Sequence, residues 1–250
     1  MQPLQRENIR LAATVMIVRD ADDGMEVYMV KRPGKGDFPD LYVFPGGKVD
    51  EDDWQPSLCP NMADSEASVR LGIDEGALRY WIAVARECFE EVGVLLARDA
   101  SGIHVPDAQQ RAAQAELRRK LLAGELSWGE VLQAQNLSIA SDRLVYFSHW
   151  LTPPSVPRRF DTRFFLAALP EGQVALADTS ETISGQWVSP RTALQLYKDK
   201  EWQMIGPTIS SLETLAKFTS AEQALADVAA ENHVQPWTEE QGEQGMRPFR

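Results

Sequence analysis

The sequence is poor in the residue types that build disulfide frameworks and zinc sites. Its 250 residues include two cysteines, Cys59 and Cys88, and three histidines, and their spacing is not that of metal ligands. Both cysteines are therefore expected to be reduced thiols, with Cys88 filling space in the core. A secreted disulfide-rich fold and a zinc enzyme are both disfavoured.

Positive charge is also scarce. The chain has 25 Lys and Arg against 37 Asp and Glu, a formal net charge of -12. A nucleic-acid groove needs a basic stripe, so no nucleic-acid partner is expected. An acidic protein that meets an anionic substrate has to recruit cations.

Long apolar runs are missing as well. No segment approaches the ~20 apolar residues of a membrane span, and residues 1–10 lack the apolar centre of a signal peptide. We therefore expect no membrane partner and, by default, a cytoplasmic location. A composition of 44% hydrophobic and 25% charged residues is that of an ordinary soluble enzyme, with one domain over 1–236 and a tail over 237–250.

What the chain does contain is a cluster of acids. Glu87, Glu90 and Glu91 are spaced i, i+3, i+4, so on an α-helix all three carboxylates share one face. Such carboxylates repel one another unless cations lie among them, and an all-oxygen site suits Mg²⁺ or Mn²⁺ better than zinc. Taken alone, the pattern is more often a solvated acidic helix face.

The flanking residues favour a functional reading of the acids. Arg86 can orient a neighbouring carboxylate through a bidentate pair, and Gly93 is placed to end the helix. Further upstream, Pro45-Gly46-Gly47 is a turn in which the backbone can come close to a ligand.

Together the two segments resemble the signature box of the Nudix hydrolases, G-x5-E-x7-R-E-U-x-E-E-x-G-U, in which U is a bulky apolar residue. Gly47 matches the opening glycine, and the second half is matched in order by Arg86, Glu87, Cys88, Glu90, Glu91, Gly93 and Val94. Two departures stand out: Asp53 replaces the first glutamate, and residues 54–85 stand where the box has seven positions. Because loop-closure entropy rises only logarithmically with length, such an insertion is tolerable.

An interrupted box resembles that of the Nudix branch around the peroxisomal coenzyme A diphosphatases. Other stretches that look shared are Lys31-Arg32, residues 159–165 and Pro207-Thr208. The L-L-T-x-R signature of another set of coenzyme A Nudix enzymes is absent, since residues 30–33 read Val-Lys-Arg-Pro.

The resemblance implies an α/β (α+β) Nudix fold, with a mixed β-sheet sandwiched between helices, an insertion inside the box and extra helices. It also implies Mg²⁺ or Mn²⁺ as cofactor. The expected ligands are the carboxylates of Glu87, Glu90 and Glu91, completed by the backbone carbonyl of Gly47 or its neighbour Gly46. Asp53, or else Asp50 or Glu51, would support Arg86 or the metal waters.

The general base is expected outside the box, because Nudix enzymes often carry it on a loop before the last strand. Glu181 lies in such a loop, 178–185, although a solvated loop acid is an equal alternative and Glu87 a second one. The expected substrate contacts, beside the two glycines, are cations that could meet phosphates: Lys31, Arg32, Arg158, Arg159 and Arg163.

Three functions remain open on the sequence. The favoured one is a divalent-metal-dependent diphosphatase that cleaves coenzyme A or acyl-coenzyme A. The same chemistry on ADP-ribose, NADH or another nucleoside diphosphate derivative is the second. A non-catalytic Nudix ligand-binding regulator is the third, which the intact acids disfavour. A small molecule is the expected partner, and a homodimer is left open.

Periodicity and turn signals place the secondary structure. Strands are expected at 11–18, 26–30, 41–44, 143–151, 160–169 and 186–188, and helices at 74–96, 191–197, 208–218 and 220–230. Residues 106–135 form a helical insertion broken at Gly124, either a lid-like pair or plain scaffold. Residues 55–73 are rich in turn formers and are expected to be a surface excursion.

Overall fold

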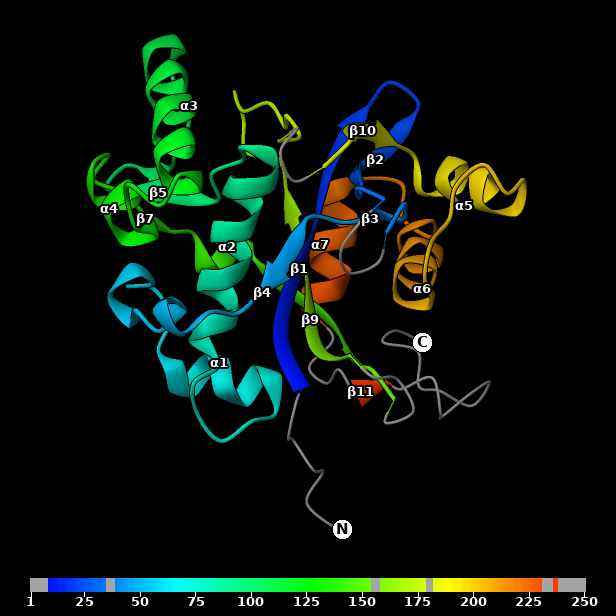
Figure 1. The fold of residues 1–250 in the computed structure, drawn as a ribbon, viewed down its shortest axis with the longest axis horizontal. Helices are drawn as coiled ribbons and strands as arrows, with labels where there is room; N and C mark the ends of the chain where they lie inside the picture. Colours follow the sequence, from blue (N-terminus) through cyan, green and yellow to red (C-terminus); the bar gives the residue numbers. More distant parts are fainter. Residues whose placement is uncertain (1–8, 35–38, 154–157, 179–181, 231–235, 238–250) are drawn as a thin grey trace.

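A computed structural model describes residues 9–34, 39–153, 158–178, 182–230 and 236–237. At its centre is a mixed β-sheet with helices on both faces (Figure 1), as the sequence predicts. The strand order is β10-β2-β1-β9-β8-β11. The strands are β1 (Ile9–Ala21), β2 (Gly24–Lys31), β8 (Val145–Leu151), β9 (Arg159–Ala168), β10 (Ser184–Val188) and β11 (Pro236–Trp237).

The first hairpin supplies the middle of the sheet. The predicted strands 11–18 and 26–30 are confirmed and are longer, as β1 and β2, with Gly24 in the turn at φ 112°. β1 also runs parallel to β9, from Ile9 opposite Arg159 to Val18 opposite Ala168. It is therefore buried on both edges as well as on both faces, which explains its unbroken apolar run.

β1 has a second partner that matters for the site. Its residues 18–21 pair with β2, whereas its residues 12–14 pair with the short β4 (Gly46–Lys48). A second short strand, β3 (Tyr42–Val43), pairs with β2 just before. The predicted strand 41–44 is thus present, and it delivers the two glycines to the middle of the sheet.

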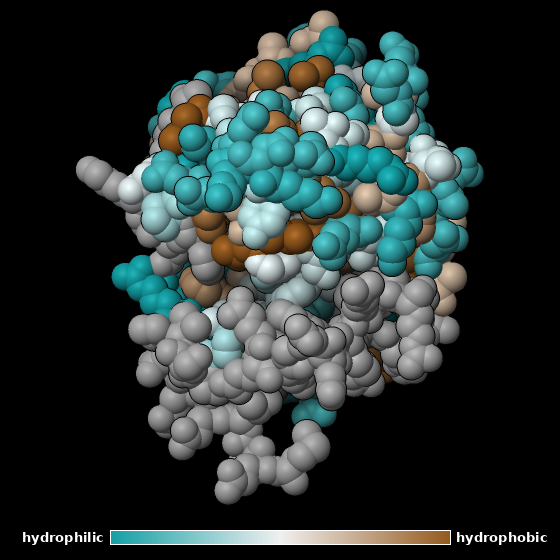
Figure 2. Space-filling view, turned by 90° about the vertical axis from the view of Figure 1, so that its right-hand side faces the viewer, coloured by the Kyte–Doolittle hydropathy of each residue, from teal (hydrophilic) through white to brown (hydrophobic). Residues whose placement is uncertain are grey.

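Alternating side chains of β1 divide the core into two layers. Val15 and Ile17 point to one face, which is covered by α1 (Asp64–Leu71) and α2 (Leu78–Val92). Met16 and Val18 point to the other, which is covered by α5 (Pro190–Lys198), α6 (Gly206–Leu215) and α7 (Ala221–Ala230). Figure 2 shows the side on which α5 and α6 lie: outside the grey segments it is mostly hydrophilic, with a narrow hydrophobic band.

The insert in the box is not the surface excursion that the sequence predicts. It contains a 3₁₀ turn at Pro56–Leu58 and the helix α1, and it buries the apolar side chains of Cys59, Met62, Ala67 and Leu71 in the core. The turn-forming residues are visible in the sequence, but a helix of eight residues is too short to show a clear helical period of apolar residues.

The carboxylate-bearing helix is shorter than predicted. It spans Leu78–Val92 instead of 74–96, because Asp64 accepts hydrogen bonds from the backbone N–H groups of Gly76 (2.8 Å) and Leu78 (2.9 Å) where the helix begins. At the other end Gly93 adopts the left-handed conformation at φ 69°. The helix thus begins where Asp64 bonds its first amides and ends at a left-handed glycine.

The predicted helical insertion is confirmed as α3 (Ala108–Leu122) and α4 (Trp128–Gln133), with Gly124 between them at φ 69°. Trp128, Val131 and Leu132 of α4 are buried, so this helix is scaffold. A small sheet that the sequence did not indicate flanks the pair: β5 (Ala97–Asp99), β6 (Gly102–Ile103) and β7 (Ser138–Ile139). Strands of two or three residues carry no readable alternation.

The C-terminal helices agree with prediction, including Pro190 at the first position of α5. The expected tail is wrong at its first residue, because Trp237 pairs with β8 in β11, while 238–250 lie outside the described residues. In the part of the chain described here, no helix has both the length and the apolar character needed to cross a bilayer.

The buried insert predicts a stability effect that a surface loop would not show. Leu71 and Val69 lie on the same helix, 4% and 82% exposed respectively. Leu71→Ala should lower the free energy of unfolding by about 3 kcal/mol, because it leaves a cavity in a packed core. Val69→Ala should change it by less than about 0.5 kcal/mol. Equal denaturation midpoints for the two variants in urea would show that the insert lies outside the cooperative core.

Candidate active site

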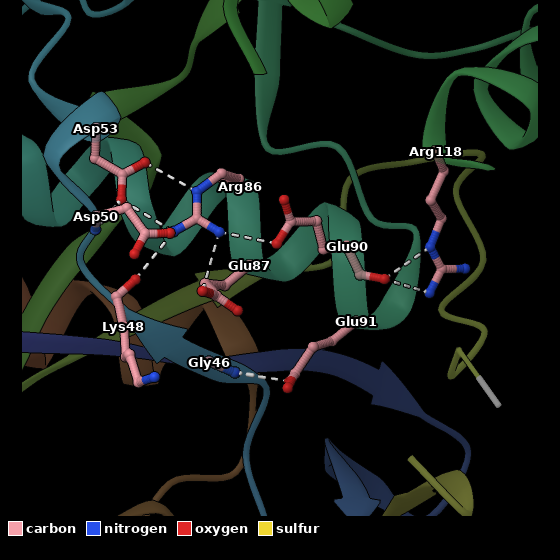
Figure 3. A network of polar contacts seen from close by, with 9 residues as sticks. All are labelled: Gly46, Lys48, Asp50, Asp53, Arg86, Glu87, Glu90, Glu91 and Arg118. Carbon is pink, nitrogen blue, oxygen red and sulfur yellow. Dashed lines mark hydrogen bonds and ion pairs between the residues drawn. The ribbon is translucent and has the colours of Figure 1, made fainter. Parts of the chain in front are cut away.

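The guanidinium of Arg86 joins the two halves of the interrupted box. Its Nε and Nη2 donate to the two carboxylate oxygens of Asp53, each at 2.9 Å, and Nη2 also donates to the backbone carbonyl of Lys48 at 2.9 Å (Figure 3). Asp53 is 2% exposed, so this bidentate pair is buried. The prediction that Asp53 supports Arg86 is confirmed.

The remaining nitrogen of Arg86 faces the acid cluster. Nη1 donates to Glu90 at 2.8 Å and to Glu87 at 3.0 Å. Burial by itself lowers the pKa of this guanidinium, but the hydrogen bond to Asp53 and the charges of Glu87, Asp53 and Glu90 outweigh it and raise the pKa above its usual value. Arg86 is therefore a permanent cation among four carboxylates, Asp50 at 3.4 Å being the fourth.

Glu87 lies beside Arg86 and the other acids of the box. Burial raises its pKa to about 8, the charges of Glu91 and Glu90 add to the rise, and Arg86 opposes it. A Cβ on Gly47 would come within 2.5 Å of the Glu87 carboxylate, so only glycine lets the backbone lie against this group. The single positive charge of Arg86 does not balance the carboxylates of Glu87, Glu90 and Glu91.

Glu91 is attached to the other glycine of the turn. Its carboxylate accepts a hydrogen bond from the backbone N–H of Gly46 at 2.9 Å, and the side chain is 5% exposed. Gly46 itself has φ 154°, and a side chain there would collide with the backbone of β1. The strand β4 and the helix α2 are therefore in contact through both glycines. Figure 3 shows the hydrogen bond between Gly46 and Glu91.

The donor set fits a hard divalent cation by its chemistry. All candidate ligands are oxygens, and the box has three carboxylates beside the single guanidinium of Arg86, which donates to two of them. Among the described residues, no three acidic, histidine or cysteine side chains already surround one point. The carboxylates of Glu87 and Glu90 instead accept hydrogen bonds from Arg86, and that of Glu91 accepts one from the backbone N–H of Gly46.

These residues line one side of a cavity of about 750 Å³. Its walls are of three kinds. The acidic part consists of Glu87, Glu90, Glu91 and Asp50, and the cationic part of Arg32, Lys48, Arg86 and Arg158. The apolar part consists of Val43, Phe44, Trp150, Leu151, Pro153, Phe160, Phe164, Ile205 and Pro207.

The predicted cationic contacts divide into those the structure brings to the cavity and those it does not. Arg32 and Arg158 line it, together with Gly46 and Gly47. Lys31 is not among the described lining residues, and its ammonium lies over the ring of Tyr42 at 5.7 Å.

The position of Arg163 corrects a prediction from the sequence. It is 4% exposed, and its Nη1 donates to the backbone carbonyl of Leu71 and the hydroxyl of Tyr146, both at 3.0 Å. The prediction that it contacts substrate phosphates is wrong, since these contacts join β9 to the insert on the face away from the cavity. Glu181 lies outside the described residues.

Two groups of site residues were missed by sequence reasoning. The sequence does not distinguish the aromatic wall of Trp150, Phe160 and Phe164 from the core, since a core side chain and a cavity side chain follow the same alternation. Lys48 was also missed, although its position directly after the glycine pair was a usable signal.

Comparison with known proteins agrees with this geometry. Residues 74–215 match the family model described as the NUDT19 Nudix domain, more than half of the chain. The chain therefore belongs to the Nudix family. The matched range contains only the second half of the box, and the Arg86–Asp53 pair is what connects the first half to it.

Two curated relatives carry a more particular name. The human acyl-coenzyme A diphosphatase NUDT19 is 27% identical over 238 residues, covering 79% of this chain and 62% of that protein. The protein of the same name from Xenopus laevis is 25% identical over 232 residues, covering 77% and 60%. The chain thus spans about 60% of the length of these relatives.

Among solved structures, a NUDIX hydrolase from Alicyclobacillus acidocaldarius superposes with a TM-score of 0.71 at 27% identity. The match covers 87% of this chain and 96% of that one. The Nudix fold predicted from the box is thereby confirmed.

The buried ion pair predicts a matched pair of substitutions. Asp53→Asn keeps the shape of the side chain but leaves a buried guanidinium with a weaker partner, and it should lower the free energy of unfolding by roughly 3 kcal/mol. Asp52→Asn, on the exposed neighbour, should have almost no effect. Chemical denaturation measures both. A stable Asp53→Asn protein would mean that Glu87 and Glu90 alone compensate Arg86.

Proposed function

We propose that this protein hydrolyses the diphosphate linkage of a nucleoside diphosphate derivative, with coenzyme A or acyl-coenzyme A as the favoured substrate and Mg²⁺ or Mn²⁺ as cofactor. The observation that carries the proposal is the single cavity in which the carboxylates of α2, several cations and an aromatic wall meet. Each of the three walls suits one part of such a substrate.

The acidic wall can hold the cation that the reaction requires. A diphosphate carries negative charge that repels a nucleophile. Glu87, Glu90, Glu91 and the carbonyl of Gly47 are the groups that would hold the divalent cation, which when bound neutralises the phosphates and lowers the pKa of a water molecule. Arg86 fixes the direction of two of these carboxylates through its hydrogen bonds.

The cationic wall suits the phosphates. Arg32, Lys48 and Arg158 line the same cavity as the acids, so that a diphosphate near α2 can meet positive charge on its far side. Coenzyme A carries a third phosphate on its ribose, and a cavity with more than one cation can accommodate it.

The apolar wall favours a substrate with an apolar portion. Trp150, Phe160 and Phe164 are joined there by Leu151 and Ile205, and a small polar nucleotide would leave this surface in contact with water. An acyl chain on pantetheine would cover it. This is consistent with the relatives that bear the name acyl-coenzyme A diphosphatase. A homodimer and a cytoplasmic location stay predictions from the sequence.

The direct test is a substrate screen. The purified protein with Mg²⁺ or Mn²⁺ should turn over acyl-coenzyme A faster than ADP-ribose, NADH or dinucleoside polyphosphates. Glu90→Gln should lower kcat at least ~10²-fold because it removes a charge that holds the cation. The control is Glu116→Gln, an exposed acid on α3. Faster turnover of ADP-ribose would change the substrate class, and no turnover at all would favour a binding protein.

The general base is proposed to be Glu181. Its support is its place in the sequence, together with the flanking Asp178, whose backbone N–H donates to the carbonyl of Glu91 at 2.8 Å. Glu181→Gln should lower kcat by about 10²–10⁴-fold with unchanged metal affinity, and it should flatten the acid limb of the pH–rate profile. Glu171→Gln, on an exposed turn, is the control. If rate and acid limb both persist, Glu87 becomes the first alternative.

A further inference from the structure

The last turn of α2 carries two of the proposed metal ligands, and backbone carbonyls of this turn are bonded by residues from distant parts of the chain. Gly93 donates back to Phe89, and the helix ends there. The backbone N–H of Asp178 bonds to the backbone carbonyl of Glu91, and the N–H of Leu176 to the carbonyl of Val92, both at 2.8 Å.

The carbonyl of Glu90 is bonded by Arg118 of α3. Nε donates to it at 2.9 Å and Nη2 at 2.8 Å (Figure 3). Nη1 donates to the carbonyl of Leu176 at 3.1 Å. One planar guanidinium therefore joins three segments: the end of α2, the segment 173–178 and the helical insertion. A Cβ on Gly93 would approach Nη1 to 3.1 Å, so the glycine also leaves room for this contact.

We propose that Arg118 is a positioning residue for the metal site, which holds the last turn of α2 and with it the carboxylates of Glu90 and Glu91. It is not among the described residues that line the cavity, so it acts through the backbone and not on the substrate. Glu90 is then held by two arginines, Arg86 at its carboxylate and Arg118 at its carbonyl. The inference rests on the proposed metal site.

The physical reason is that helix ends fray. Unbonded carbonyls at a helix C-terminus exchange partners with water, and a cation there is favourable because it faces the negative end of the helix dipole. Fraying of the last turn would displace Glu90 and Glu91 relative to Glu87, which lies one turn further inside. Outer-shell partners of this kind typically change metal affinity or activity by 10–100-fold.

Arg119 provides a matched control. It is the next residue on α3, it carries the same charge, and its guanidinium bonds to Glu116 and Glu125 on the exposed side. Arg118→Gln should weaken Mn²⁺ binding, measured by titration calorimetry on the full-length protein, by about 10-fold. Arg119→Gln should leave it unchanged.

Amide hydrogen exchange gives a readout that does not need the metal. Loss of Arg118 should speed exchange in the segment 173–178, whose Leu176 and Asp178 amides donate to α2, while β8 stays as protected as in the wild type. Faster exchange throughout the protein would indicate general destabilisation and would overturn the assignment.

Arg118→Lys separates the shape of the guanidinium from its charge and serves if the Gln variant does not fold. A lysine keeps the cation but cannot bond both carbonyls in the arginine geometry, so only partial recovery of Mn²⁺ affinity is expected. Full recovery, or equal affinity of Arg118→Gln and Arg119→Gln, contradicts the proposal. If the wild type itself does not bind Mn²⁺, the metal site is wrong, and the exchange comparison alone decides whether Arg118 holds α2.

Discussion

The buried guanidinium of Arg86 is the interaction on which the candidate site depends. It holds Asp53 with two hydrogen bonds on one side and Glu87 and Glu90 on the other, so it fixes three acids at once. A buried cation of this kind is stable only when several acceptors surround it, and buried acids need a cation in return. Neither group could remain in this part of the core without the other.

This pair also explains how the box tolerates its interruption. Residues far apart in the chain are brought together by side-chain contacts, so the number of residues between them is of little consequence. The insert adds contacts of its own: it buries Leu71, whose carbonyl accepts a hydrogen bond from Arg163 of β9, and it supplies Asp64, which bonds the first amides of α2. It is a structural part of the domain core.

The helix α2 is consequently held at both ends by segments that lie outside the box residues. Asp64 bonds its N-terminal end, and Arg118 with Leu176 and Asp178 bonds its C-terminal end. Site residues keep their geometry when the element that carries them is itself fixed. The helical insertion and the insert in the box therefore contribute to the site even though neither supplies one of its carboxylates.

The sequence by itself determined the family box, the helix that carries the acids and most strands, because these depend on local spacing and periodicity. It also indicated the partner of Arg86, since Asp53 occupies a box position. Only the tertiary structure decided that the insert is core, that Arg163 is buried away from the cavity, and that Trp150 lines it. Alternation along a strand shows which side chains share a face, but what covers that face is decided by segments distant in the chain.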